Sequence, residues 1–381
     1  MRRSATSREA FAGRFLVPAI LVLVTLAAFA AWLLIRPSDG VRVEAVQSGL
    51  EHPWDLAFTP DGRMVVTERA GRVLVYASAH AGAELLSTTV VPDVRAELES
   101  GLMGVAVSGD TVFVCASRDP SGDGGDPWRV ELLRATIGSD ASLTAFAPIA
   151  IGETIGGPRH QGCAVEVADG FLWLSIGDAN LAGEANPAQD PTLSNGKVLR
   201  LELDGSIPPD NPFGARSPVF SLGHRNPQGL TVRSDGLVLE VEHGTDENDE
   251  VNVIVPGGNY GYPCWTGADA TGPWPEGCAP AADYLAPAWA SGAPTLATSG
   301  ATFLSGPTWS AWDGDLVVTT LKESDLRRFA VTEDGTVALV DTLLDGSFGR
   351  LRAAVIGPDG ALYLTTSNGS GDRILRVVPS G

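Results

Sequence analysis

Two groups of charged side chains late in the chain could bind ligands of opposite charge. Arg350 and Arg352 are separated by one residue, and alternate residues of a strand point the same way, so both guanidinium groups can face one anion. The second group is an acidic run made of Asp246, Glu247, Asp249 and Glu250. Carboxylate oxygens are ligands that calcium prefers. The alternatives are strand ends paired with surface acids, and a solvated, metal-free loop.

Several other chemistries are excluded. The chain has five His and four Cys, with no Cys-x-x-Cys and no His-Glu-x-x-His, so the common zinc sites are absent. No Gly-x-Gly-x-x-Gly opens a helix after a strand, so no nucleotide fingerprint is visible. The net charge is −20, from 26 Lys and Arg against 46 Asp and Glu. Such a polyanion does not bind nucleic acid by neutralising phosphates.

The N-terminal segment is expected to be a membrane anchor. Phe15 to Ile35 is uncharged, and about 20 apolar residues span a bilayer as a helix. Arginines dominate the upstream flank, so we expect residues 1–14 in the cytoplasm, a transmembrane signal anchor at 15–35 and a linker at 36–40. The remainder, 41–381, would lie on the exported side of the cell membrane, periplasmic or extracellular. Ala28–Ala30 resembles a cleavage site, and cleavage would secrete the protein.

The exported part repeats. Hydrophobic residues make up 44% of the chain, enough for a core, and the 45 Gly and 26 Pro favour a chain with many turns. An aspartate-containing turn followed by alternating apolar residues recurs at intervals of 46 to 78 residues. The six turns contain Asp61, Asp110, Asp169, Asp235, Asp313 and Asp359. This pattern predicts an all-β, six-bladed β-propeller behind the N-terminal helix, with a pair of β-sandwiches as the alternative.

Three further expectations concern the propeller. Val41–Val46 should complete the last blade beside the C-terminal strand, and the uneven spacing predicts long loops in blades three to five. Cys264 and Cys278 flank one loop and could staple it. Cys115 and Cys163 lie in neighbouring units and could also pair, with buried free thiols as the alternative.

The chain resembles the glucose/sorbosone dehydrogenase family, which includes soluble sugar dehydrogenases that use pyrroloquinoline quinone (PQQ). The resemblance is carried by ten segments in family order, none specific when taken singly. They are Leu50–Gly62, Gly101–Gly104, His160–Gly162, Ser175–Asp178, Gly196–Leu201, Ile207–Phe213, Gly223–Gly229, Glu242–Gly244, Asp249–Asn252 and Gly258–Pro263. The family fold is a six-bladed propeller, in agreement with the repeat count.

The resemblance implies an active site. His160 matches the base that takes the proton from the anomeric hydroxyl, and a histidine titrates in a range that suits this work. Arg225 and Asn226 match a pair that contacts the quinone, and Gln228 matches a further contact. Arg225 would also stabilise negative charge on a quinone oxygen, as a second catalytic residue. The alternatives are a structural histidine and a salt bridge between blades.

Further cofactor ligands follow from the same resemblance. Lys322, one of two lysines in the chain, matches a family lysine in a late blade, and Arg350 and Arg352 match a pair that grips cofactor carboxylates. Calcium is the family metal. Its ligands would be Gly244 and Thr245 at one site, through backbone carbonyls, and Glu250 and Tyr260 at a second site. Calcium would act as a Lewis acid on the quinone.

Two residues of the cofactor site depart from the family pattern. Glu99 stands where cofactor-binding members carry a glutamine, and its carboxylate is expected to repel an anionic quinone. Arg159 stands where better-known members have an aspartate beside the base. We expect this cation to lower the proton affinity of His160 and to remove an orienting carboxylate, although it could instead grip a carboxylate of the cofactor.

The sequence leaves three functions open. In the first, an exported, tethered, calcium- and PQQ-dependent dehydrogenase oxidises an aldose to a lactone and passes electrons to a respiratory or artificial acceptor. In the second, the propeller is redox-inactive and binds carbohydrate or protein. A calcium-dependent lactonase is the third. His160, Arg225, Lys322 and the Arg350/Arg352 pair favour the first, whereas Glu99 and Arg159 favour the second.

Overall fold

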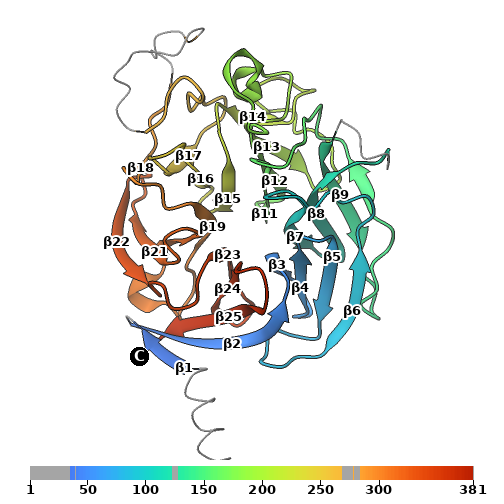
Figure 1. The fold of residues 1–381 in the computed structure, drawn as a ribbon, viewed down its shortest axis with the longest axis vertical. Coiled ribbons are helices and arrows are strands. Elements are labelled where there is room, and N and C mark those ends of the chain that lie inside the picture. Colours follow the sequence, from blue (N-terminus) through green and yellow to red (C-terminus); the bar gives the residue numbers. More distant parts are fainter. Residues whose placement is uncertain (1–34, 39, 122–127, 268–277, 279–283, 381) are drawn as a thin grey trace, which may run out of the picture.

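The computed structural model describes residues 35–38, 40–121, 128–267, 278 and 284–380. In this part of the chain the strands form six antiparallel sheets arranged as blades around an axis (Figure 1). This is the predicted six-bladed β-propeller, and the paired-sandwich alternative is wrong. Three short 3₁₀ helices lie in connections: η1 (Gly183–Ala185), η2 (Pro187–Gln189) and η3 (Ser310–Trp312).

Each blade uses four consecutive strands, except the last. Blade one contains β3 (Pro53–Phe58), β4 (Met64–Glu68), β5 (Arg72–Tyr76) and β6 (Leu85–Val90). Blade two contains β7 (Leu102–Ser108), β8 (Thr111–Arg118), β9 (Arg129–Thr136) and β10 (Ala147–Ile149). Blade three contains β11 (Gly162–Ala168), β12 (Phe171–Ile176), β13 (Lys197–Glu202) and β14 (Val219–Leu222). Blade four contains β15 (Pro227–Val232), β16 (Val238–Glu242), β17 (Glu250–Ile254) and β18 (Trp289–Ala290). Blade five contains β19 (Thr298–Phe303), β20 (Leu316–Thr320), β21 (Leu326–Val331) and β22 (Val337–Leu343). Blade six is β23 (Leu351–Ile356), β24 (Leu362–Thr366), β25 (Asp372–Pro379), with β2 (Val41–Leu50) and β1 (Ile35–Ser38).

The ring is closed by strands from the two ends of the sequence. Strand β2 pairs antiparallel with β25, from Val41 opposite Pro379 to Leu50 opposite Asp372, as predicted from Val41–Val46 (Figure 1). Strand β1 then pairs with β2 as a fifth strand. Residues 36–40 were expected to be a linker, but most of them belong to this strand.

The predicted membrane anchor lies outside the described residues, apart from Ile35 at the start of β1. Within the part that the structure describes, no helix is long and apolar enough to span a bilayer.

All six aspartate-containing turns connect the first strand of a blade to the second. The sequence repeat is therefore the blade repeat. Long connections follow β12 (residues 177–196) and β17 (residues 255–288), in blades three and four, whereas those described in blade five are shorter. The expectation of long loops is thus confirmed for two of the three blades.

The core is divided among the blade interfaces. Six separate apolar clusters occur among the described residues, and each lies mainly between two neighbouring blades. Cys115 of β8 and Cys163 of β11 form a disulfide across one such interface, with 5.6 Å between their Cα atoms. Cys264 and Cys278 form the second disulfide, within the connection after β17. Both predicted pairings are confirmed.

The innermost strands follow one another around the axis, in the order β3, β7, β11, β15, β19 and β23. Each shifts register against the second strand of its blade, as between Thr298 and Ala301 in β19 and between Leu351 and Ala354 in β23. Such bulges bend a strand and redirect its side chains. The strands also approach closely, because a Cβ at Gly300 would lie 2.5 Å from the carbonyl oxygen of Arg352.

This close approach predicts that Gly300→Ala destabilises the propeller. The obstacle is the backbone of the next blade, which cannot rotate away, so we expect a loss of about 1–3 kcal/mol or more in the free energy of unfolding. Gly157→Ala is the matched control, because its Cβ would meet only ordinary contacts, at 3.6 Å and beyond. Thermal unfolding that gives equal midpoints for both variants would contradict this packing.

Candidate active site

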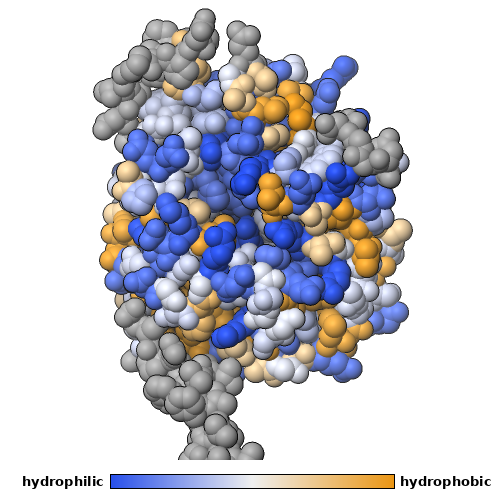
Figure 2. Space-filling view, in the orientation of Figure 1, coloured by the Kyte–Doolittle hydropathy of each residue, from blue (hydrophilic) through white to orange (hydrophobic). Residues whose placement is uncertain are grey.

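The predicted site residues meet at one end of the axis because of the strand pairing. In each antiparallel pair the start of the first strand faces the end of the second, as Gly162 faces Ile176 and Pro227 faces Glu242. Residues just before an innermost strand therefore lie beside residues just after a second strand. A cavity of about 320 Å³ lies between the innermost strands. Figure 2 shows hydrophilic side chains around a hollow in the centre of the face that it displays.

His160 is paired with Asp178. The imidazole Nδ1 lies 2.8 Å from Oδ1 of Asp178, and both side chains are buried. A carboxylate accepts only, so Nδ1 carries the proton and Nε2 keeps a lone pair. His160 has a φ of 53°, in the left-handed region, and Gly177 packs against its carbonyl. The expected loss of an orienting carboxylate is therefore wrong, because Asp178, rather than residue 159, provides it.

Glu99 and Arg159 are paired with each other. Arg159 Nη1 lies 3.0 Å from Glu99 Oε1, and Glu99 Oε2 accepts a hydrogen bond of 3.1 Å from the backbone N–H of His160. Burial alone would raise the pKa of Glu99. That N–H and the charges of His160, His243 and Arg159 outweigh burial and hold the pKa below its ordinary value. Glu99 is therefore ionised, and the charge of Arg159 neutralises it. The side chain of Arg159 remains half exposed in this ion pair.

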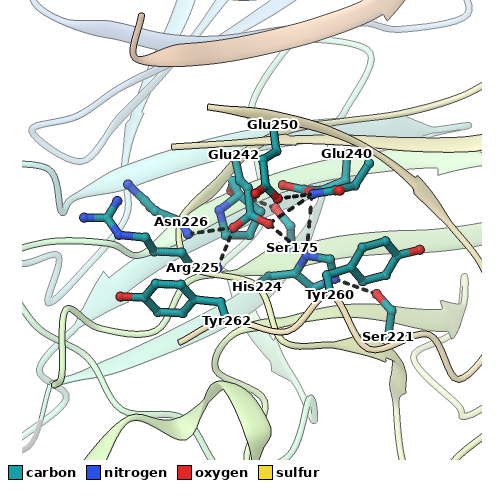
Figure 3. Close-up of polar contacts among 12 residues, drawn as sticks. Ser175, Ser221, His224, Arg225, Asn226, Glu240, Glu242, Glu250, Tyr260 and Tyr262 are labelled. Atoms are coloured by element: carbon teal, nitrogen blue, oxygen red, sulfur yellow. Dashed lines mark hydrogen bonds and ion pairs between the residues drawn. The ribbon is translucent and has the colours of Figure 1, made fainter. Parts of the chain in front are cut away.

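Arg225 and Asn226 are held in place by Glu242, the last residue of β16. Glu242 Oε2 accepts hydrogen bonds from the backbone N–H groups of both residues, as the close-up in Figure 3 shows. The guanidinium of Arg225 lies 6.0 Å above the ring of Tyr262 and donates to the carbonyl of His243 at 3.2 Å. Its Nε is buried and has no hydrogen-bond partner among the residues that the structure describes. A ligand that offers an acceptor would satisfy this atom.

A directed chain of hydrogen bonds joins blades four, five and six. Arg352 Nη1 donates to Gln228 Oε1 (3.1 Å), and Gln228 Nε2 donates to Asn226 Oδ1 (2.9 Å). Asn226 Nδ2 then lies 3.4 Å from Nδ1 of His243, whose Nε2 lies 2.6 Å from the carbonyl of Thr298. Burial lowers the pKa of His243, although the charges of Asp249 and Glu99 oppose this. The chain fixes the three predicted cofactor contacts Asn226, Gln228 and Arg352 relative to one another.

Four cationic side chains of the site form hydrogen bonds only with neutral groups within the described part of the chain. They are Arg225, Lys322, Arg350 and Arg352. Lys322 Nζ contacts Thr295 Oγ1 and Arg350 Nη1 contacts the carbonyl of Leu321, both at 3.3 Å. Burial and repulsion from Arg350 lower the pKa of Arg352, which lies 3.6 Å from the ring centre of Trp54. In contrast, Arg118 and Arg328 each bind two acids. The four cations are thus free to bind an anion, as a tricarboxylate such as PQQ requires.

The predicted metal residues occupy two surroundings. At the first, the backbone N–H of Gly244 donates to Asp249 Oδ1 (2.8 Å), and Asp249 Oδ2 accepts from the N–H groups of Leu296 and Ala297. The carboxylate of Asp249 therefore shapes the loop. Thr245 is exposed, as are Asp246 and Glu247. Metal binding by the backbone carbonyls of Gly244 and Thr245 stays a prediction from the resemblance.

At the second, Glu250 lies in a buried carboxylate cluster with Glu240 and Glu242 (Figure 3). The amide nitrogen of Asn252 lies 3.1 to 3.3 Å from all three carboxylates. In the described part of the chain, Glu240 Oε1 has no hydrogen-bond partner. His224 Nδ1 lies 3.3 Å from Glu242, and its ring stacks on Tyr260. Three carboxylates against one amide and one imidazole are a donor set that fits a hard cation.

Tyr260 offers this cluster only its backbone. Its hydroxyl donates to the carbonyl of Val253 and accepts from the N–H of Val255. A role of Tyr260 in binding a metal would therefore use the backbone carbonyl, as the resemblance implies.

Sequence reasoning missed several residues of the site. Asp178, Glu242, His243 and His224 lie within the segments that carried the resemblance, but no role was attached to them. Pairing depends on backbone register between segments 16 to 18 residues apart. One signal in the sequence could have pointed to Asp178. It is the carboxylate in the segment Ser175–Asp178, which follows the segment that contains the expected base His160.

Comparisons with known proteins agree with this arrangement. The family model described as Glucose / Sorbosone dehydrogenase matches residues 50–376. The aldose sugar dehydrogenase YliI of Escherichia coli is 32% identical, over 94% of this chain and 98% of that protein. A crystal structure of the soluble aldose sugar dehydrogenase of E. coli in the apo-form has a TM-score of 0.78 at 30% identity, covering 89% of this chain and 99% of the other. The PQQ-bound aldose sugar dehydrogenase of Streptomyces coelicolor has a TM-score of 0.72 at 25% identity, covering 90% of this chain and all of the other.

The carboxylate cluster predicts stability that depends on pH and calcium together. Burial, then the charge of Glu242, raise the pKa of Glu250 to about 8, and burial also raises that of Glu240. A raised pKa stabilises the fold below the unfolded value of about 4.5 and loses this contribution as pH rises toward 8. Calcium binds ionised carboxylates, so it should raise the melting temperature more at about pH 8.5 than at about pH 5.

The measurement is thermal unfolding with calcium and with a chelator at both pH values. Glu250→Gln should remove much of the calcium effect, whereas Glu247→Gln, in the exposed loop, should leave it unchanged. A calcium effect that is equal at both pH values, or equal in both variants, would exclude Glu250 as a ligand.

Proposed function

The chain belongs to the glucose/sorbosone dehydrogenase family, and we propose that it is a PQQ-dependent dehydrogenase that oxidises the anomeric hydroxyl of an aldose to a lactone. The observation that carries this proposal is a buried His160–Asp178 pair at the same axial end as four cationic side chains with neutral partners. The relatives named as aldose sugar dehydrogenases, one of them PQQ-bound, support the substrate class and the cofactor.

His160 acts as the general base. With Nδ1–H held by Asp178, Nε2 is the nitrogen that accepts the proton of the substrate hydroxyl. Once His160 is protonated, the negative charge of Asp178 stabilises the imidazolium, and the bond between them keeps the ring from rotating. The anomeric carbon, which bears this hydroxyl, would lose its hydrogen as a hydride to the cofactor. Loss of the proton from oxygen and of the hydride from carbon together convert the aldose to the lactone.

Six side chains at this end of the axis would hold PQQ: Arg225, Asn226, Gln228, Lys322, Arg350 and Arg352. PQQ, when bound, supplies an acceptor for the hydride. The unpartnered Nε of Arg225 and the guanidinium of Arg352 offer donors to an anion in a site with little water. Calcium would bind at the carbonyls of Gly244 and Thr245, and a second ion at Glu250 and the carbonyl of Tyr260.

Glu99 and Arg159 compensate each other in this proposal. The carboxylate that would repel PQQ is neutralised by the guanidinium that would disturb the base. The two departures that favoured a redox-inactive binding propeller therefore have a common explanation. Arg159 does not need to grip the cofactor, because its Nη1 is engaged by Glu99.

The proposal extends to the place of the reaction. Residues 15–34 would anchor the propeller on the exported side of the cell membrane, unless the segment is cleaved; the predicted anchor is one residue shorter because Ile35 belongs to β1. Anchoring would keep the enzyme near a respiratory electron acceptor.

Reconstitution tests the function directly. Purified residues 35–381 with PQQ and calcium should shift the quinone absorbance and reduce an artificial dye with at least one aldose. His160→Ala should abolish dye reduction, because only the proton acceptor is lost, and should keep the wild-type affinity for PQQ. His80→Ala, at an exposed histidine, is the matched control. Absence of both quinone binding and dye reduction across an aldose panel would refute the proposed function.

A double-mutant cycle tests the compensation between Glu99 and Arg159. Arg159→Ala should weaken PQQ binding, because it leaves an ionised carboxylate near the cofactor, and Glu99→Gln should tighten it. The double variant should bind more tightly than Arg159→Ala alone. Arg216→Ala, at an exposed arginine, controls for the loss of one positive charge. Calorimetric titration that gives the wild-type affinity for PQQ in both single variants would show that the pair does not act on the cofactor.

A further inference from the structure

Asn186 holds the far oxygen of Asp178. Its Nδ2 donates to Asp178 Oδ2 at 2.8 Å, and the second hydrogen of the same nitrogen donates to the carbonyl of Leu181 at 2.7 Å. Its Oδ1 accepts from the backbone N–H of Ala188 at 2.9 Å. Both hydrogens of the amide and its oxygen are thus engaged, so the orientation of the amide is determined by its three neighbours.

The turn that follows Asn186 is held in place by a buried lysine. Lys197, the first residue of β13, is fully buried and donates to the carbonyls of Pro187, Ala188 and Asn195 at 2.6 to 3.0 Å. Gly196 lies against Ala188, where a Cβ would come within 2.6 Å of its Cα. The ammonium group therefore fixes η2 on the sheet, and Asn186 immediately precedes η2.

We infer that Asn186 is a positioning residue for the general base, acting through Asp178. This inference rests on the proposed function, in which His160 removes the substrate proton. A carboxylate can rotate about its last torsion. When Asn186 holds Oδ2 and the N–H of Asn180 contacts Oδ1, that rotation is restricted and Oδ1 stays directed at His160 Nδ1.

The consequence is a single tautomer of His160. In the neutral ring, the held Asp178 keeps the proton on Nδ1, so Nε2 is the nitrogen that can accept the substrate proton. Without the donor from Asn186, Asp178 can turn away, and the imidazole can populate the other tautomer or rotate. Because hydrogen bonds to charged groups contribute about 1.5–3 kcal/mol, we expect a loss of about tenfold or more in turnover.

Asn186 also caps η2, so the test must separate the two roles. Asn186→Asp keeps an acceptor for the N–H of Ala188, and Asp is as good an N-cap as Asn, but it cannot donate to Asp178. Asn186→Ser likewise keeps a capping oxygen without adding charge. Ala182→Asp is the matched control, because it introduces the same charge in the same loop at an exposed side chain.

The experiment compares these variants by three measurements. These are turnover at saturating PQQ, PQQ affinity by calorimetry, and the ¹⁵N chemical shifts of the His160 ring, which report its tautomer. For Asn186→Asp we expect turnover lowered by about tenfold or more, an unchanged PQQ affinity, and mixed tautomers of His160. Ala182→Asp should match the wild type in all three. Asn186→Ser should follow Asn186→Asp and decides the question if the charged variant does not fold.

Wild-type turnover with an unaltered His160 tautomer in both Asn186 variants would overturn the inference. So would a loss of the same size in Ala182→Asp. Failure of the wild type to bind PQQ or to oxidise any aldose would refute the proposed function instead. The tautomer of His160 in the protein without cofactor would still decide whether Asn186 positions Asp178.

Discussion

The break in register at the start of each innermost strand is the feature on which the site depends. Regular pairing would continue the alternation of side chains between the two faces of a blade. The shift in β11, β15, β19 and β23 instead releases the residues at the end of the axis from the ladder. His160, Arg225 and Arg350 lie one or two residues before such strands, and their partners lie at or just after the ends of the second strands. One local irregularity, repeated by the fold, thus places residues from different blades around one point.

The charges at this point are arranged against the trend of the whole chain. With a net charge of −20, an arginine is easily paired, and several on the outer strands each bind one or two acids. At the axial end, Arg225, Lys322, Arg350 and Arg352 contact amides, hydroxyls and carbonyls instead. Neutral partners orient a cation without cancelling its charge. The lowered pKa of Arg352 reflects what this burial costs, and an anionic ligand would offset that cost.

The fold was largely predictable because its signals are local. An aspartate-containing turn followed by alternation specifies a hairpin, and six repeats with a leftover N-terminal strand specify a closed ring. The site was predictable only where a resemblance attached roles to residues. Asp178 and Glu242 act through pairing between segments, and Asn186 acts through a three-residue turn fixed by a buried lysine. These relations depend on register and on loop geometry, which no single segment of the sequence contains.

Glu99 and Arg159 show why residues cannot be judged one at a time. Each alone is unfavourable in a site that binds an anion beside a base, and the two lie 60 positions apart in the sequence. Their side chains are 30% and 49% exposed, so solvent screens the pair and it adds little to the stability of the fold. Its effect is local, because Glu99 also accepts a hydrogen bond from the backbone N–H of His160, which links the pair to the backbone of that residue. The pair therefore preserves the charge balance that a neutral side chain at position 99 would provide, while adding a bond that restrains His160.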